Sequence, residues 1–199
     1  MTDPSFTLSA DAGALDRLSA AVKGAGAKTP PVERWNPPFC GDIDMRIAAD
    51  GAWFYNGTPI GRPALVRLFA SILRRDPERF VLVTPVERVG IAVEDAPFLA
   101  VEMAVAGDGL GRTIAFRTNV DDLVHVDAAH PLRFDKDEGG GIKPYVLVRG
   151  GLWALVTRAL TFDLVELGED RAVDGALMFG VGVGEMFFPI APASDKATS

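Results

Sequence analysis

Arginine dominates the residues of this chain that could do chemistry. Of the 20 basic residues 15 are arginine, and a guanidinium offers a planar fork of donors that matches a phosphate or a carboxylate. Arg62 stands directly before Pro63, at the expected start of a helix, where free N–H groups already favour an anion. The other candidate contacts are arginines at strand ends or on polar strand faces, and aromatic stacking surfaces: Trp35, Arg46, Arg117, Tyr145 and Arg149. These residues predict a site for a small anion.

Each of these candidates also has a simpler explanation. The arginine excess accompanies an Ala- and Gly-rich composition. Arg62 could be an ordinary surface arginine or the partner of a carboxylate, and Trp35 could pack on the adjacent prolines. Two further candidates, Thr84 and Glu87, flank Pro85 at an expected strand break. Side chains there can project into a cleft, but a plain β-bulge explains them equally well.

No catalytic signature is present in the sequence. The chain has no Gly-x-Ser-x-Gly elbow and no phosphate-binding Gly-Lys-Ser/Thr loop. Cys40 follows Phe39, which predicts a buried structural thiol rather than a nucleophile. One segment gathers carboxylates and both histidines, Asp121, Asp122, His125, Asp127 and His130, but its spacing is not diagnostic of a metal site. We therefore predict no cofactor and favour a non-enzymatic protein.

Composition limits the cellular setting. The 199-residue chain carries 27 acidic residues and a net charge of −7, which argues against a basic footprint for nucleic acid. A single cysteine fits a reducing compartment. No basic region followed by an apolar run opens the chain, and no window approaches about 18 continuous apolar residues. We expect a soluble, cytoplasmic protein without a membrane partner.

Hydrophobic periodicity predicts an α+β fold. Residues 63–76 have one apolar face and should form a helix that ends at Asp76-Pro77, and residues 152–167 read as a second helix. Short β runs lie before, between and after these helices: 43–47, 53–55, 80–84, 86–93, 98–105, 112–118, 123–126, 145–149 and 176–190. The alternating glycines of the last run should leave one strand face bare for close packing.

The order of strands and one helix occurs twice, which predicts two related small domains. We place a short helix and linker at residues 1–31, a first domain at 32–106 and a second at 107–199. Open sheets leave edge strands that need covering, which is compatible with a homodimer.

Three dense blocks of sequence resemble the bacterial family called domain of unknown function 1285. They are the run from Trp35 to Ile60, the run from Leu82 to Phe98, and Pro144 to Arg149. The resemblance implies a duplicated core whose C-terminal half is similar to a pleckstrin-homology barrel. It also implies a nucleotide-like ligand at the interface of the two domains and a role in signalling.

Three hypotheses therefore stand at the level of sequence. The first is a non-enzymatic sensor for a small anionic, nucleotide-like ligand. The second is an enzyme of unrecognised type that uses Glu87 or the cluster of Asp121, His125 and His130. The third is a pure protein-interaction module. We favour the first, because catalysis normally needs a base or nucleophile held by a second group.

Overall fold

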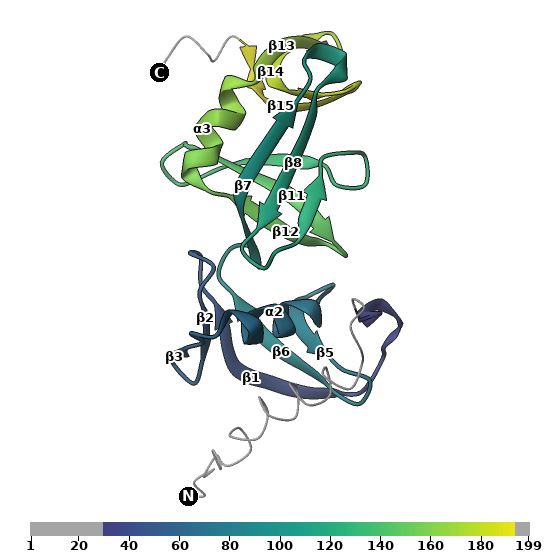
Figure 1. Ribbon diagram of the computed structural model, residues 1–199, viewed down its shortest axis with the longest axis vertical. Coiled ribbons are helices and arrows are strands. Elements are labelled where there is room, and N and C mark those ends of the chain that lie inside the picture. Colours follow the sequence, from purple (N-terminus) through teal and green to yellow (C-terminus); the bar gives the residue numbers. More distant parts are fainter. Residues whose placement is uncertain (1–29, 194–199) are drawn as a thin grey trace, which may run out of the picture. The chain divides into compact units, whose positions relative to one another are not determined.

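The structure is a computed structural model that describes residues 30–193. The helix expected within residues 1–31 lies outside the described residues. The chain divides into two compact units, Met1–Glu94 and Asp95–Ser199 (Figure 1). The boundary predicted after residue 106 differs from this division. The reason is that residues 98–106 form a strand that pairs only with strands of the second unit.

The first unit is a six-stranded sheet with one helix. After a short 3-10 turn, η1 (Val32–Arg34), its elements are β1 (Phe39–Ile47), β2 (Trp53–Tyr55), β3 (Thr58–Pro59), α2 (Pro63–Ser71), β4 (Leu73–Asp76), β5 (Arg79–Val83) and β6 (Arg88–Val93). The strand order is β3-β2-β1-β6-β5-β4. Neighbouring strands are antiparallel except β1 and β6, which are parallel.

The second unit contains a second six-stranded sheet, a helix and a three-stranded sheet. Its elements are β7 (Phe98–Ala106), η2 (Gly109–Gly111), β8 (Thr113–Thr118), β9 (Leu123–His125), β10 (Leu132–Lys136), β11 (Ile142–Arg149), β12 (Leu152–Val156), α3 (Arg158–Glu166), β13 (Gly168–Val173), β14 (Ala176–Val183) and β15 (Met186–Pro192). The larger sheet has the order β10-β11-β12-β7-β8-β9, and β13, β14 and β15 form an antiparallel meander.

Both six-stranded sheets follow one plan. Each joins two antiparallel three-stranded meanders through a parallel pair made by its first and last strands, β1 with β6 and β7 with β12. The helix differs in place: α2 lies between the meanders of the first unit, whereas α3 follows the last strand of the second sheet. The predicted α+β class and the two related domains are confirmed. The curled second sheet with its C-terminal helix is a half-barrel that fits a pleckstrin-homology-like fold.

One face of the first sheet packs on α2. Trp53 of β2 stacks on Phe69 of α2 with ring centroids 6.4 Å apart, and Ile47 pairs with Trp53 on the same face. All three side chains are at most 2% exposed. Because side chains alternate along a strand, Arg46 must lie on the opposite face. Arg46 therefore lies on the face of the sheet away from Trp53 and Phe69.

The second unit has its own core. Phe98, Phe116, Ala154 and Leu164 of β7, β8, β12 and α3 are fully buried. The glycines of β14 behave as the sequence predicts: a Cβ on Gly180 would collide with the backbone of β15. Close strand packing therefore explains Gly180, whereas a Cβ on Gly182 would meet the side chains of Glu169 and Arg171.

Both predicted helices are shorter in the structure than in the sequence-based assignment. The first ends at Ser71, because Leu73–Asp76 pairs with β5 as strand β4. Asp76 is the last residue of β4 and Pro77 begins the hairpin turn, so neither residue ends a helix. The second begins at Arg158, because Leu152–Val156 pairs with β11 and β7 as strand β12. In both places strand pairing with a distant segment overrides the local helical pattern.

Candidate functional site

Four arginines share the face of the first sheet that is opposite α2. We call this surface the arginine face and define it by Arg46, Arg74, Arg79 and Arg88. Register places them together: Arg88 pairs with Phe39, Arg46 pairs with Ala92, and Arg74 and Arg79 lie at alternate positions of adjacent strands. Only Arg46 of these four was a candidate from the sequence.

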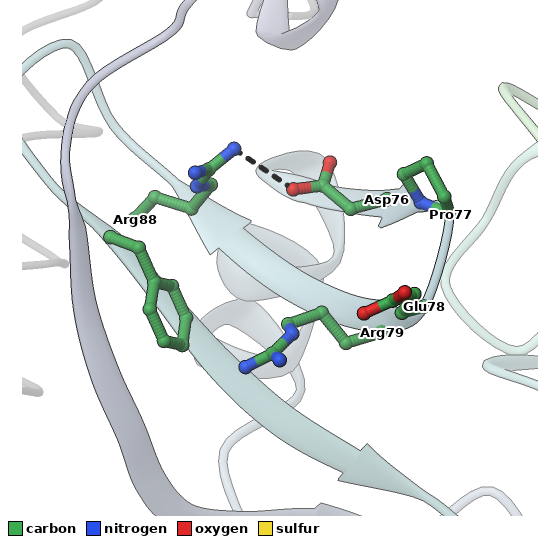
Figure 2. Close-up of a pocket in the computed structure, with 6 residues that line it drawn as sticks. Asp76, Pro77, Glu78, Arg79 and Arg88 are labelled. Carbon is green, nitrogen blue, oxygen red and sulfur yellow. Dashed lines mark hydrogen bonds and ion pairs between the residues drawn. The ribbon is translucent and has the colours of Figure 1, made fainter.

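A pocket of about 400 Å³ lies on the arginine face, and we call it the arginine pocket. It is lined by Phe39, Asp76, Pro77, Glu78, Arg79 and Arg88 (Figure 2). The Phe39 side chain is 40% exposed. Two guanidiniums lie over its ring, with the Cζ of Arg79 at 4.7 Å and the Cζ of Arg88 at 5.9 Å from the centroid. An aromatic surface and two donor forks thus meet in one hollow.

The arginines at the pocket differ in how closely they pair with carboxylates. Asp76 accepts a hydrogen bond from Arg74 Nε at 2.7 Å and one from Arg88 Nη1 at 3.1 Å, so one carboxylate serves two guanidiniums. Figure 2 shows the pair of Arg88 and Asp76. Among residues 30–193, Arg79 forms a single, longer ion pair, 3.5 Å to Asp42 Oδ1, and both side chains of that pair are well exposed. Arg79 is therefore the lining cation with the most donor capacity to offer a ligand.

Local sequence explains how the pocket forms. Pro77 and Glu78 make the tight turn between β4 and β5, and this turn puts Asp76 and Arg79 directly opposite each other. Gly90 of β6 lies beside Asp42, and a Cβ there would overlap the Asp42 carboxylate. Glycine at position 90 therefore keeps room for Asp42 next to Arg79.

The other sequence candidates of the first unit lie outside the arginine pocket. Arg46 pairs with Glu94, whose pKa is lowered by the N–H of Ala49 and then by Arg46. Arg62 is exposed and is the N-cap residue of α2, as expected, without a side-chain cap. Trp35 is half-buried, and its carbonyl oxygen accepts a hydrogen bond from Arg74 at 2.6 Å.

Thr84 and Glu87 belong to the turn between β5 and β6. Thr84 is fully buried, and its Oγ1 accepts the backbone N–H of Glu87 at 3.1 Å. The backbone N–H of Thr84 donates to the carbonyl of Glu87 at 2.9 Å. A ligand could not reach the Thr84 hydroxyl, because the turn already encloses and uses it.

The candidates of the second unit are held by carboxylates. Arg117 bonds Glu102 and Asp121. Its hydrogen bond lowers the pKa of Glu102, and the same bond raises the pKa of the Arg117 guanidinium. Arg149 pairs with Asp122. The structure thus assigns ion-pair partners to both arginines.

Tyr145 is buried at 5% exposure and donates its hydroxyl to Asp95 Oδ1 at 2.7 Å. Burial, and then Asp95, raise the pKa of the phenol. Lys143 bonds the other oxygen of Asp95, which raises the pKa of the ammonium. Tyr145 is therefore part of a polar cluster inside the second unit.

The carboxylate and histidine segment lines a separate pocket of about 260 Å³ together with Arg149. His130 Nδ1 lies 2.9 Å from Asp127 Oδ1, and this contact lowers the pKa of Asp127. Within residues 30–193 no group of three or more His, Cys, Asp or Glu side chains is arranged to hold a metal ion. Asp127 also accepts the backbone N–H groups of Ala129 and His130, so it closes a turn as well.

The buried thiol predicted for Cys40 is wrong, because the residue is exposed. The first half of β1 lies open to solvent, and only its later residues, such as Met45 and Ile47, enter the core. The same exposure makes the neighbouring Phe39 ring available to the arginine pocket. Sequence reasoning missed Phe39, Arg79 and Arg88, and the only local hint was an apolar residue at the open start of a strand.

Fold and site together define a two-domain α+β protein with two curled sheets, the second of which fits a pleckstrin-homology-like half-barrel. Family models described as the N-terminal and C-terminal domains of DUF1285, a domain of unknown function, match residues 30–96 and 97–190. The chain therefore belongs to the DUF1285 family. No curated protein matches it significantly.

Two solved structures are similar to this chain. A DUF1285 family protein from Silicibacter pomeroyi DSS-3 is 48% identical with a TM-score of 0.81, over 89% of this chain and 96% of that one. A DUF1285 family protein from Shewanella baltica OS155 is 30% identical with a TM-score of 0.49, over 61% of this chain and 90% of that one. No helix among the described residues is long and apolar enough to cross a membrane.

Proposed function

We propose that this protein is a non-enzymatic binding protein for a small, planar, nucleotide-like anion, and that the arginine pocket is its site. The observation that carries the proposal is the half-exposed Phe39 ring with Arg79 and Arg88 above it. A volume of about 400 Å³ lies within the range of small-molecule sites, roughly 300–1,000 Å³. A mononucleotide is the class of ligand that matches this size and chemistry.

Each part of such a ligand has a counterpart in the pocket. Stacking of a base on an aromatic side chain is worth about 1–3 kcal/mol, and the Phe39 ring or a guanidinium plane supplies the surface. The phosphate can accept hydrogen bonds from the guanidinium of Arg79, because the ion pair between Arg79 and Asp42 is long and exposed. Arg88 stays with Asp76 and adds positive charge at the edge of the ring.

Glu78 works against an anion, because its carboxylate lines the same pocket. No ion pair joins it to another residue of the described segment. It therefore offers a clean electrostatic test. Removing its charge should strengthen the binding of a phosphate, whereas removing the charge of Arg79 should weaken it.

The experiment is calorimetric titration of the full chain with nucleoside 5′-monophosphates and with the matching nucleosides. A hydrogen bond to a charged group contributes about 1.5–3 kcal/mol, so Arg79→Gln should weaken monophosphate binding by at least about tenfold. Glu78→Gln should tighten it. Arg75→Gln is the matched control, because Arg75 lies on the same strand as Arg74, covers the ring of Phe80 at 4.5 Å and does not line the pocket.

Two results would overturn this proposal. One is the absence of binding by every monophosphate. The other is equal loss of binding in Arg75→Gln and Arg79→Gln, which would show a nonspecific charge effect. The role in signalling implied by the family resemblance is part of the proposal: binding without turnover would report ligand concentration to a partner.

The second candidate function is that of an enzyme, and the contact between His130 and Asp127 favours it. Its Nδ1 is held by Asp127 at 2.9 Å beside a pocket of about 260 Å³, as a general base oriented by a second group would be. Slow conversion of a nucleotide during the titration, lost in His130→Gln, would support it. An unchanged nucleotide after prolonged incubation would exclude this reaction.

A further inference from the structure

A groove of about 650 Å³ runs along α3 in the second unit, and we call it the α3 groove. One wall is a single face of the helix, with Arg158, Thr161, Phe162 and Val165 at helical spacing. The other wall comes from β11, β12 and the loop before β11, with Asp137, Gly141, Ile142, Lys143, Pro144, Leu155 and Val156. Most of these lining side chains are apolar.

The α3 groove exposes apolar surface that the fold itself does not cover. Phe162 is 60% exposed and Ile142 is 36% exposed, although both belong to regular elements. Hydrophobic side chains scattered singly on a surface are ordinary, but here they line one concavity. The groove therefore suits the apolar body of a ligand.

The charges at the groove select the head of that ligand. Lys143 is bonded to Asp95, and the carboxylate of Asp137 accepts the N–H of Gly141 at 2.6 Å. Arg158 makes no ion pair with any residue of the segment 30–193, and its Cζ lies 6.0 Å from the centroid of the Phe162 ring. Asp137 keeps its negative charge at the loop end of the groove, where it binds the backbone, whereas the positive charge of Arg158 lies beside Phe162, the most exposed apolar ring of the groove.

We propose that the α3 groove binds a single-chain amphiphile with an anionic head, such as a medium-chain carboxylate. The head would accept hydrogen bonds from Arg158, and the chain would lie on Phe162 and along the apolar wall towards Val165 and Leu155. This site is separate from the arginine pocket, because it lies in the other unit and selects an apolar chain rather than a planar ring.

The test compares ligands that share one chain length and differ in charge. The full chain is titrated with decanoate and with decyltrimethylammonium, each below its critical micelle concentration, by calorimetry and by amide NMR shifts. Decanoate should bind with a stoichiometry of one and shift the amides of Thr161 and Val165. Decyltrimethylammonium should bind at least about tenfold more weakly, because it cannot pair with Arg158.

Three variants locate the site. Arg158→Gln should weaken decanoate binding about tenfold and leave the cationic amphiphile unaffected. Phe162→Ala should weaken both about tenfold through lost apolar contact. Leu177→Ala is the matched control, since Leu177 is 57% exposed and lies outside the groove. Because all three side chains are exposed, circular dichroism should show unchanged folding.

Several outcomes would overturn this inference. They are no decanoate binding, equal affinity for the two amphiphiles, no effect of Arg158→Gln, or the same loss in Leu177→Ala as in Phe162→Ala. Binding to phosphatidylglycerol vesicles that exceeds binding to free decanoate would assign the groove to a membrane surface instead. None of these results depends on whether nucleotides bind the arginine pocket.

Discussion

Thr84→Val removes one hydroxyl from the core and should destabilise the first unit measurably. Thr84 and Thr118 are fully buried threonines, one in each unit. The Oγ1 of Thr84 accepts the N–H of Glu87 at 3.1 Å and lies 3.4 Å from the N–H of Val86. Valine keeps the shape of threonine, so the substitution deletes these acceptor contacts with little change in packing volume.

The magnitude follows from the donor that is left without a partner. An unsatisfied buried N–H costs about 1–3 kcal/mol. The Val86 contact is long and its side chain is 71% exposed, so most of the loss comes from Glu87. Because Glu87 is itself only half-buried, we expect a loss of about 1 kcal/mol in the free energy of unfolding, which for a unit of this size lowers the melting midpoint by about 4–8 °C.

Calorimetry and amide hydrogen exchange measure this effect. The transition of the first unit should move down, and the Glu87 amide should lose protection before the amides of β5 do. Thr58→Val is the matched control, because Thr58 lies exposed on β3. Equal shifts in Thr58→Val and Thr84→Val, or an unchanged Glu87 amide, would refute the reasoning.

Four further predictions concern the core, the termini of elements and the response to pH. Thr118→Val should destabilise the second unit by a similar amount, about 1–3 kcal/mol, because its Oγ1 accepts the N–H of Asp122 at 3.0 Å; the check is a downward shift of the second transition alone. Phe69→Ala should cost about 3–5 kcal/mol, because the ring is fully buried on Trp53, and urea unfolding should show it. The absorbance titration of the protein minus that of Tyr145→Phe should show that Tyr145 has a pKa above the ordinary tyrosine value of about 10. Because burial raises this pKa in the folded state, the protonated phenol contributes fully to the free energy of unfolding below about pH 10. That contribution is lost as the pH rises through the raised pKa. Arg74→Gln should free the segment of η1, which Arg74 holds through the carbonyls of Val32 and Trp35, and limited proteolysis near η1 should become faster; an unchanged cleavage rate would contradict this role.

Much of the fold could be predicted because it depends on short-range patterns. The run Ile43, Met45 and Ile47 alternates as a strand does, and it lies within β1. Pro63 marks the first turn of α2, where a missing N–H costs nothing. Glycine and proline residues correctly predicted the breaks between most strands. These signals act over a few residues and are therefore visible in one sequence.

The ends of the helices could not be predicted in this way. Leu73–Asp76 continues the apolar pattern of α2 but becomes a strand through pairing with β5. Leu152–Val156 likewise gains a neighbour on each side, β11 and β7. Hydrogen bonds to distant strands outweigh a local preference of a few tenths of a kcal/mol per residue.

By itself the sequence determined the α+β class, the two related units, the excess of arginine over lysine and the absence of a catalytic signature, because each is a property of residues close together in the chain or of composition. Only the tertiary structure decided which arginines meet. The parallel pairing of β1 with β6 puts Phe39 against Arg88, and the β4–β5 hairpin brings Asp76 and Arg79 beside them. Register between distant strands depends on packing of the opposite face against α2, and no local pattern of charges encodes it.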